Sequence, residues 1–205
     1  MHDEVLTQSA AGLLPPLVRF KDFYLVGGTA LALQIGHRRS VDFDLFSEKP
    51  LPAGLLAQVK RICAPRSVVV TYRSPEQLNV LIGDIKTTFM FFPYPVVDSF
   101  VAYRGLRLAS ISEIAAMKAF AIGKRLSFKD YVDWYFMLKE KRVMFQEVIA
   151  LAQKKFGGDF NDRLFLGQLV SLADVPEQTI DFLRGSVDKA EIGRFLESEV
   201  KSFLL

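Results

Sequence analysis

The chain has 205 residues, a formal net charge of +3 and 50% hydrophobic residues. It can therefore bury a sizeable core, and disorder is excluded as its main state. The small charge does not by itself indicate nucleic-acid binding. One cysteine and two histidines exclude a disulfide framework and argue against a histidine-based metal site. No segment approaches the roughly 18 apolar residues of a membrane helix, and no secretory signal is recognisable, so we expect a soluble, cytoplasmic protein.

The first 109 residues mix helical and strand patterns. A short helix is expected over 4–14, ending at Pro15-Pro16, and a strand over 23–26, ending at Gly27-Gly28. A helix then begins near Thr29, and residues 41–46 alternate apolar and acidic side chains, as strands do. Beyond these we expect a helix at 52–63, strands at 67–72, 78–82 and 85–92 in an antiparallel meander, and a last strand at 106–109.

Residues 110–205 are predicted to be helical. Ser110-Ile-Ser-Glu113 is a capping-box pattern. Helices are expected to about Arg125 and at 129–141, 144–156, 161–172, 176–184 and 188–203. The predicted fold class is α/β (α+β): a small mixed sheet with flanking helices over 1–109, followed by a C-terminal helical lobe over 110–205 that packs on it.

Gly27 and Gly28 follow a predicted strand and open a predicted helix. Glycine permits strained backbone angles and close approach of a ligand, and the amides of a helix N-terminus can hold a phosphate. Thr29 adds a hydroxyl donor. A Gly-Gly turn by itself also fits an ordinary connection between elements.

Asp42 and Asp44 lie two residues apart in a predicted strand. Alternate strand residues share a face, and neighbouring carboxylates repel each other unless a cation lies between them. Mg²⁺ is commonly bound by one or two carboxylates together with water and substrate phosphates. An exposed strand face is the alternative for an isolated acidic pair, but this pair starts thirteen residues after Thr29, which is a narrower pattern.

The string GGTALAL…GHRRSVDFDLF resembles the nucleotidyltransferase superfamily, in its AbiEii/AbiGii toxin-type branch. The segment KAFAIGKRLSFKDYVDWYFML, from Lys118 to Leu138, is similar to the downstream motif of that branch. The resemblance covers about residues 20–140 and implies a nucleotidyltransferase-like fold.

The resemblance also implies roles for individual residues. Gly27, Gly28 and Thr29 would hold the nucleotide phosphates, and Asp42 and Asp44 would bind Mg²⁺. Arg38 and Ser40 would contact phosphate or brace the loop. Lys118 would extend toward the triphosphate, with Asp130 and Asp133 nearby. The alternatives to these site roles are that Lys118 is a solvated surface residue and that Asp130 is a charge at a helix start.

The sequence departs from the superfamily at one position. Active members generally carry a third carboxylate on a later strand, which here contains no acid from residue 85 to residue 97. Thr87 or Thr88 stands in its place, and Asp84 could substitute only if the register shifted. The third carboxylate positions a metal ion or activates the attacking hydroxyl.

The resemblance implies transfer of a nucleoside monophosphate from an NTP, with Mg²⁺, to an RNA, protein or small-molecule acceptor. It also implies the toxin component of a toxin–antitoxin system, with an antitoxin protein as partner. The alternative is a catalytically degenerate nucleotide- or protein-binding module with the same fold. A helical DNA-binding protein ranks last because no strong basic stripe is present.

Overall fold

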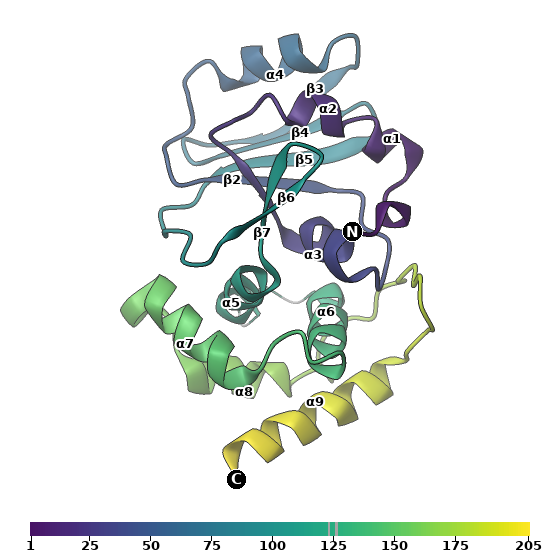
Figure 1. The fold of residues 1–205 in the computed structure, drawn as a ribbon, viewed down its shortest axis with the longest axis vertical. Coiled ribbons are helices and arrows are strands. Elements are labelled where there is room, and N and C mark those ends of the chain that lie inside the picture. Colours follow the sequence, from purple (N-terminus) through teal and green to yellow (C-terminus); the bar gives the residue numbers. More distant parts are fainter. Residues whose placement is uncertain (123, 126) are drawn as a thin grey trace. The chain divides into compact units, whose positions relative to one another are not determined.

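The computed structural model of the chain (Figure 1) describes residues 1–122, 124–125 and 127–205. It divides into two compact units, Met1–Ser110 and Ile111–Leu205. The first is α/β and the second is helical, so the predicted fold class is confirmed.

The first unit is built on a seven-stranded mixed sheet with the order β3-β4-β5-β2-β1-β7-β6. β2 is parallel to β5 and β1 is parallel to β7, whereas the other neighbouring pairs are antiparallel. The predicted meander is the β3–β4–β5 part of this sheet. The strands are β1 (Tyr24–Val26), β2 (Phe43–Ser47), β3 (Val68–Arg73), β4 (Gln77–Ile82), β5 (Ile85–Phe91), β6 (Phe100–Tyr103) and β7 (Leu106–Ala109).

The two faces of the sheet differ around its centre. On β2, Phe43 and Leu45 are buried, whereas Asp44 and Phe46 are half-buried. The buried face continues at Phe89 of β5, whose ring contacts those of Phe20 and Phe23, at 5.0 and 5.2 Å between centroids. This aromatic cluster forms a core on one face and leaves Asp44 on the other.

All the helices of the first unit precede β3 in the chain: α1 and α2 come before β1, α3 connects β1 to β2, and α4 connects β2 to β3. α3 packs against β1 and β2, and α4 buries Leu55, Val59 and Ile62. The bounds are α1 (Gln8–Ala11), α2 (Leu14–Leu17), α3 (Gly27–Ile35) and α4 (Leu55–Cys63), with a short 3-10 turn at Asp3–Val5.

The structure corrects the prediction at the N-terminus. Instead of the helix expected over 4–14, the chain forms a 3-10 turn followed by α1. Thr7 caps the N-terminus of α1, because its hydroxyl oxygen accepts a hydrogen bond from the Ala10 amide at 3.2 Å. Pro15 and Pro16 do not end a helix; they lie in the first turn of α2. Proline is tolerated there because the amides of a first turn have no partner within the helix.

Strand β6 was missed in the sequence. It forms a hairpin with β7, and the two linking residues, Arg104 and Gly105, have φ values of 46° and 83°. Positive φ at both central residues is the geometry of a type I′ turn, whose twist suits a two-residue hairpin. Arg-Gly is not one of the strong sequence signals for this turn, and β6 has only four residues.

The second unit contains α5 (Ile111–Ala121), α6 (Phe128–Lys139), α7 (Phe145–Phe156), α8 (Asp162–Leu169) and α9 (Lys189–Leu204), with a 3-10 turn at Gly157–Asp159. Its core contains Trp134, which is fully buried against Phe165 and Phe145. Glu113, assigned to a capping box from sequence, forms a buried ion pair with Lys155 at 2.6 Å, which links α5 to α7. Within the described residues, no helix is long and apolar enough to cross a membrane.

Two helix predictions in this unit were wrong. α5 ends at Ala121 rather than near Arg125; Gly123, inside the predicted stretch, lies outside the described residues. The helix expected at 176–184 does not form. That segment lacks a continuous apolar stripe, and tertiary contacts hold it: the Phe182 ring lies 6.1 Å from that of Phe136, and Arg184 pairs with Glu140 at 2.7 Å.

Candidate functional site

The Gly27-Gly28 turn joins the end of β1 directly to the start of α3. Gly27 has a φ of +73°, and a Cβ placed on it would lie 2.5 Å from Oδ2 of Asp44. Glycine is therefore required here twice over, by the backbone angle and by the close approach of the carboxylate. This contact brings Asp44 to the N-terminus of α3.

Arg38 and Ser40 approach the same turn from the loop after α3. A Cβ on Gly28 would lie 2.5 Å from Nη2 of Arg38 and 3.3 Å from Oγ of Ser40. Arg38 is only 3% exposed, and its Nη1 donates to the Arg39 carbonyl at 3.0 Å. A guanidinium and the positive end of a helix dipole meet at this point, and both attract anions.

Thr29 braces this loop. Its hydroxyl lies 2.9 Å from the Ser40 hydroxyl and also donates to the Asp42 carbonyl. The side chain is 2% exposed. Ser40 was expected either to contact phosphate or to brace the loop. Its contact with the Thr29 hydroxyl corresponds to the second role.

Asp42 and Asp44 differ in position. Asp44 is the second residue of β2, opposite Val26 of β1, whereas Asp42 is exposed and precedes the strand by one residue. The expected strand start near residue 41 is therefore corrected to Phe43. The two carboxylates still belong to one short extended segment beside the Gly27-Gly28 turn.

The sheet register identifies the residue in place of the third carboxylate. Asp44 pairs with Thr88 on the parallel strand β5, and Thr88 pairs with Asn79 on β4. Paired residues share a sheet face, so Thr88 is the neighbour of Asp44, while Thr87 pairs with Phe43 on the buried face. Asp84 lies in the β4–β5 turn, four residues or about 13 Å along the strand, and does not substitute.

A metal centre made of protein side chains alone is not present among the described residues: no three His, Cys, Asp or Glu side chains come together there. Thr88 is the cross-strand neighbour of Asp44, and Asp42 lies two residues before Asp44 in the chain. Such a set suits a hard cation that also takes oxygen ligands from its substrate.

In the helical unit, Lys118 forms a buried ionic network. Its Nζ lies 2.6 Å from Asp130 and 2.6 Å from Asp133, and all three side chains are at most 5% exposed. Arg125, which is largely exposed, donates to both oxygens of Asp130 at 2.8 and 2.9 Å. The sequence predicted that the two aspartates lie near Lys118, but the contact between Asp130 and Arg125 was missed.

Two pKa values within this network are displaced by opposing causes. Burial raises the pKa of Asp130, but attraction and hydrogen bonds from Lys118 and Arg125 outweigh it and hold that pKa below its ordinary value. Burial lowers the pKa of Lys118, but Asp133 and Asp130 outweigh it, and the net change is upward. Both groups are therefore charged at neutral pH. The approach of Lys118 to the acidic pair stays a prediction.

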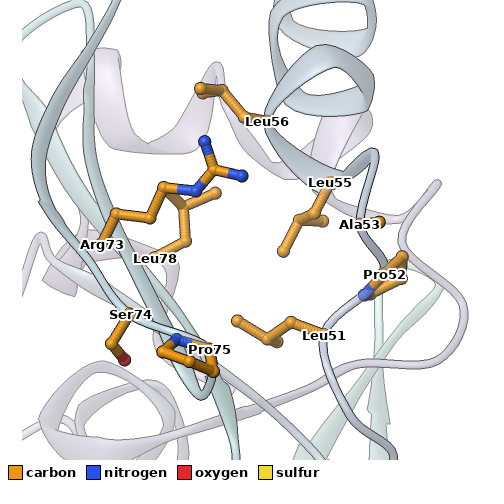
Figure 2. A pocket seen from close by; sticks show the side chains of 9 residues that line it. All are labelled: Leu51, Pro52, Ala53, Leu55, Leu56, Arg73, Ser74, Pro75 and Leu78. Carbon is orange, nitrogen blue, oxygen red and sulfur yellow. The ribbon is translucent and has the colours of Figure 1, made fainter.

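A pocket of about 140 Å³ lies elsewhere in the first unit, between the start of α4 and the β3–β4 turn. Figure 2 shows the Arg73 side chain extending across it from β3 toward α4, with Leu55 and Leu78 among the apolar residues that line it. None of the site residues predicted from sequence lines this pocket.

Comparison with solved structures supports the fold. The chain is similar to the crystal structure of a provisionally assigned nucleotidyltransferase from H. pylori, with 19% identity, a TM-score of 0.61 and coverage of 100% of this chain and 98% of that one. It is also similar to the crystal structure of JHP933 from Helicobacter pylori, with 21% identity, a TM-score of 0.58 and coverage of 97% and 95%. The chain therefore has the fold of these proteins.

Sequence comparison identifies the family. The chain is 32% identical over 189 residues to the uncharacterized protein aq_aa25 of Aquifex aeolicus (strain VF5), covering 89% of this chain and 88% of that protein. Residues 13–202 match the family described as nucleotidyl transferase AbiEii toxin, type IV TA system. The chain belongs to the AbiEii nucleotidyltransferase family, as the glycine turn and the acidic pair indicated.

Gly27→Ala is expected to lower the free energy of unfolding by about 2–4 kcal/mol, because the positive φ costs about 1–2 kcal/mol and the new Cβ collides with Asp44. Gly83→Ala is the matched control: Gly83 has a φ of +64°, but no atom lies within 4 Å of its Cβ position. Urea denaturation of both variants measures the difference. Equal losses would contradict the close contact between Gly27 and Asp44.

Proposed function

We propose that the chain transfers a nucleoside monophosphate from an NTP to an acceptor and releases pyrophosphate. The observation that carries this proposal is the convergence on one turn of the N-terminus of α3, the Arg38 guanidinium and the Asp44 carboxylate. A triphosphate bound with a divalent cation requires this combination, since phosphate oxygens need positive partners and the cation needs carboxylates. Family membership supports the same chemistry.

Each residue at the turn has a role in this proposal. The amides at Gly27 and Gly28 and the Arg38 side chain bind phosphate oxygens, while Thr29 and Ser40 hold the loop. Asp42 and Asp44 would hold Mg²⁺, and this donor set fits because carboxylate oxygens suit a hard cation that takes its other ligands from water and phosphates. Because Gly27 has no Cβ, the Asp44 carboxylate can lie against the N-terminus of α3. When bound, Mg²⁺ neutralises charge on the phosphates. We further propose that Lys118 and Asp130 act by holding Arg125, the exposed end of their network, in place.

The reaction balances without an additional reactant. The acceptor oxygen forms a bond to the α-phosphorus, the bond from that phosphorus to the oxygen bridging to the β-phosphate breaks, and pyrophosphate leaves. The proton of the acceptor hydroxyl passes to solvent water. Thr88 stands where a third carboxylate would be placed to accept it, so we expect slow transfer.

The acceptor presents a hydroxyl or phosphate and belongs to an RNA, a protein or a small molecule. We propose, from the family description, that the chain acts as a toxin in the cytoplasm and is countered by an antitoxin protein. Cells that express the chain without and with a cognate antitoxin would test that role by their growth.

A second function is favoured by one observation. Thr88 cannot supply the charge that a third carboxylate would bring next to Asp44. A chain that binds Mg²⁺ and nucleotide without transferring it, a catalytically degenerate binding module, fits that site equally well. The two functions share the nucleotide site and differ only in turnover.

The nucleotide site is tested by thermal melting with and without Mg²⁺ and each NTP. At a ligand concentration 100-fold above Kd, binding adds about 2.7 kcal/mol, which corresponds to a rise in Tm of roughly 5–10 °C for a chain of this size. Asp42→Ala is expected to remove this rise. It should leave the Tm without ligand almost unchanged, because Asp42 is exposed and exposed carboxylates contribute little stability.

Asp84→Ala is the control for this experiment, since Asp84 is also exposed and lies outside the site. It should keep the full ligand-induced rise. A wild-type Tm that no NTP changes, in the presence of Mg²⁺, would count against both the transferase and the nucleotide-binding module.

A further inference from the structure

Phe46 lies on the same sheet face as Asp44 and is the first of three aromatic rings in contact with one another. Asp44 and Phe46 are alternate residues of β2, on the half-buried face of that strand, so their Cα atoms are about 7 Å apart. The Phe46 ring lies 5.2 Å from that of Phe92, which lies 5.1 Å from that of Tyr94. Phe92 extends the sheet beyond β5, because its amide donates to the Ser47 carbonyl at 2.8 Å.

These rings differ from the core aromatics on the opposite face. Phe43 and Phe89 are fully buried there, each at 0% exposure. Phe46, Phe92 and Tyr94 are each only half-buried. Each therefore keeps part of its surface accessible, near the C-terminal end of the strand that carries Asp44.

The segment that carries the rings is held in place. Tyr94 lies between Pro93 and Pro95, whose φ angles are fixed by their rings. The Val96 amide donates to Oε1 of Glu48 at 2.5 Å, and Glu48 directly follows β2. Aromatic side chains that are fixed before binding lose little conformational freedom when a ligand stacks on them.

We propose that Phe46, Phe92 and Tyr94 form a stacking platform for a nucleobase of the substrate. The proposal rests on the proposed function, which places the phosphates at Gly27-Gly28 and Asp44. Stacking of a base on an aromatic side chain tolerates every base, because each has a π-face. The platform therefore adds affinity for a nucleotide over its phosphates alone and discriminates only modestly between bases.

The base belongs either to the donor NTP or to an RNA acceptor, and binding measurements on the full chain separate the two. The probes, each with Mg²⁺, are inorganic tripolyphosphate, ATP and a short single-stranded oligoadenylate. Tyr94→Leu and Phe92→Leu should weaken binding of ATP, or of the oligoadenylate, about five- to 100-fold. Both variants should leave the affinity for tripolyphosphate unchanged.

Two further variants serve as controls. Tyr94→Phe keeps the ring and should restore wild-type affinity. Phe100→Leu removes a partly exposed ring on β6, which is three strands from β2, and should change no affinity. Thermal melting confirms that each variant folds.

The outcomes are distinguishable. A loss confined to ATP supports the platform and assigns it to the donor base, and a loss confined to the oligoadenylate supports it and assigns it to the acceptor. Unchanged affinity for both probes in folded Tyr94→Leu and Phe92→Leu overturns it. A wild-type chain that binds the oligoadenylate through these rings but neither tripolyphosphate nor ATP overturns the proposed function and leaves the platform standing.

Discussion

Lys118→Met is expected to lower the free energy of unfolding of the helical unit by about 3–5 kcal/mol, which is the usual result of removing one partner from a buried ion pair. Among the described contacts of Asp130 and Asp133, Lys118 is the buried cation, and it lies 2.6 Å from each of these two buried carboxylates. Methionine fills a similar volume, so the loss reports the uncompensated charge more than a cavity. Urea denaturation followed by circular dichroism measures it.

The same variant should respond to pH in a particular direction. In the wild type the pKa of Asp130 is depressed, so its contribution is complete above the unfolded value of about 3.8 and is lost as pH falls through the folded value. The pKa of Lys118 is raised, so its contribution is complete below about 10.5 and is lost as pH rises through the folded value. Neutral pH lies inside both limits.

Without Lys118, Arg125 is the remaining described cation that opposes the effect of burial on Asp130, so the pKa of Asp130 rises relative to the wild type, and protonation at lower pH relieves part of the buried charge. The difference in stability between Lys118→Met and the wild type should therefore be smaller at pH 5 than at pH 7. Lys129→Met is the control: Lys129 is exposed on α6, and its loss should stay within about 0.5 kcal/mol. Equal stability losses for the two variants would contradict the buried network.

Thr88→Asp is expected to increase nucleotidyl transfer at least tenfold, a change of about 1.4 kcal/mol in the activation barrier. The register places residue 88 beside Asp44, so the new carboxylate would complete an acidic triad able to position a metal ion or accept the acceptor's proton. Without Mg²⁺ the variant should be less stable than the wild type, since the added charge repels Asp44. Initial rates and Tm, each with and without Mg²⁺, measure both effects.

Thr88→Asn separates charge from shape. It keeps a polar side chain of nearly the same size as aspartate and should give no increase in rate. If Thr88→Asp folds and binds nucleotide but transfers no faster than the wild type, residue 88 does not stand for the third carboxylate. The chain would then be better described as a binding module.

Much of the first unit could be predicted because its signals are local. The alternation over residues 41–46 predicted a strand that the structure places at Phe43–Ser47, and the glycines after Val26 predicted the turn. The contact of Gly27 with Asp44 follows from the pairing of β1 with β2, which bring those signals together. From the sequence, either Thr87 or Thr88 could stand in place of the third carboxylate. Choosing between them required the strand register, because a one-residue shift moves every side chain to the other face.

The rest depended on contacts between residues far apart in the chain. The helix expected at 176–184 does not form, and Phe182 of that segment packs on Phe136 instead. Glu113, expected in a capping box, forms an ion pair between α5 and α7 with Lys155. From the sequence, Lys118 was expected either at the nucleotide site or on the solvated surface. Its burial between Asp130 and Asp133 could not be inferred from the spacing of charges. Tertiary packing decided each of these cases.

The most direct test of the central claim is transfer of label from NTPs that carry it at the α- or the γ-phosphate, with Mg²⁺ and with RNA or protein as acceptor. We expect slow incorporation of α-label into the acceptor, none of γ-label, release of pyrophosphate, and loss of incorporation in Asp44→Asn. Incorporation of γ-label would show phosphoryl rather than nucleotidyl transfer. If neither the wild type nor Thr88→Asp transfers α-label from any NTP to any acceptor, the chain is not a nucleotidyltransferase.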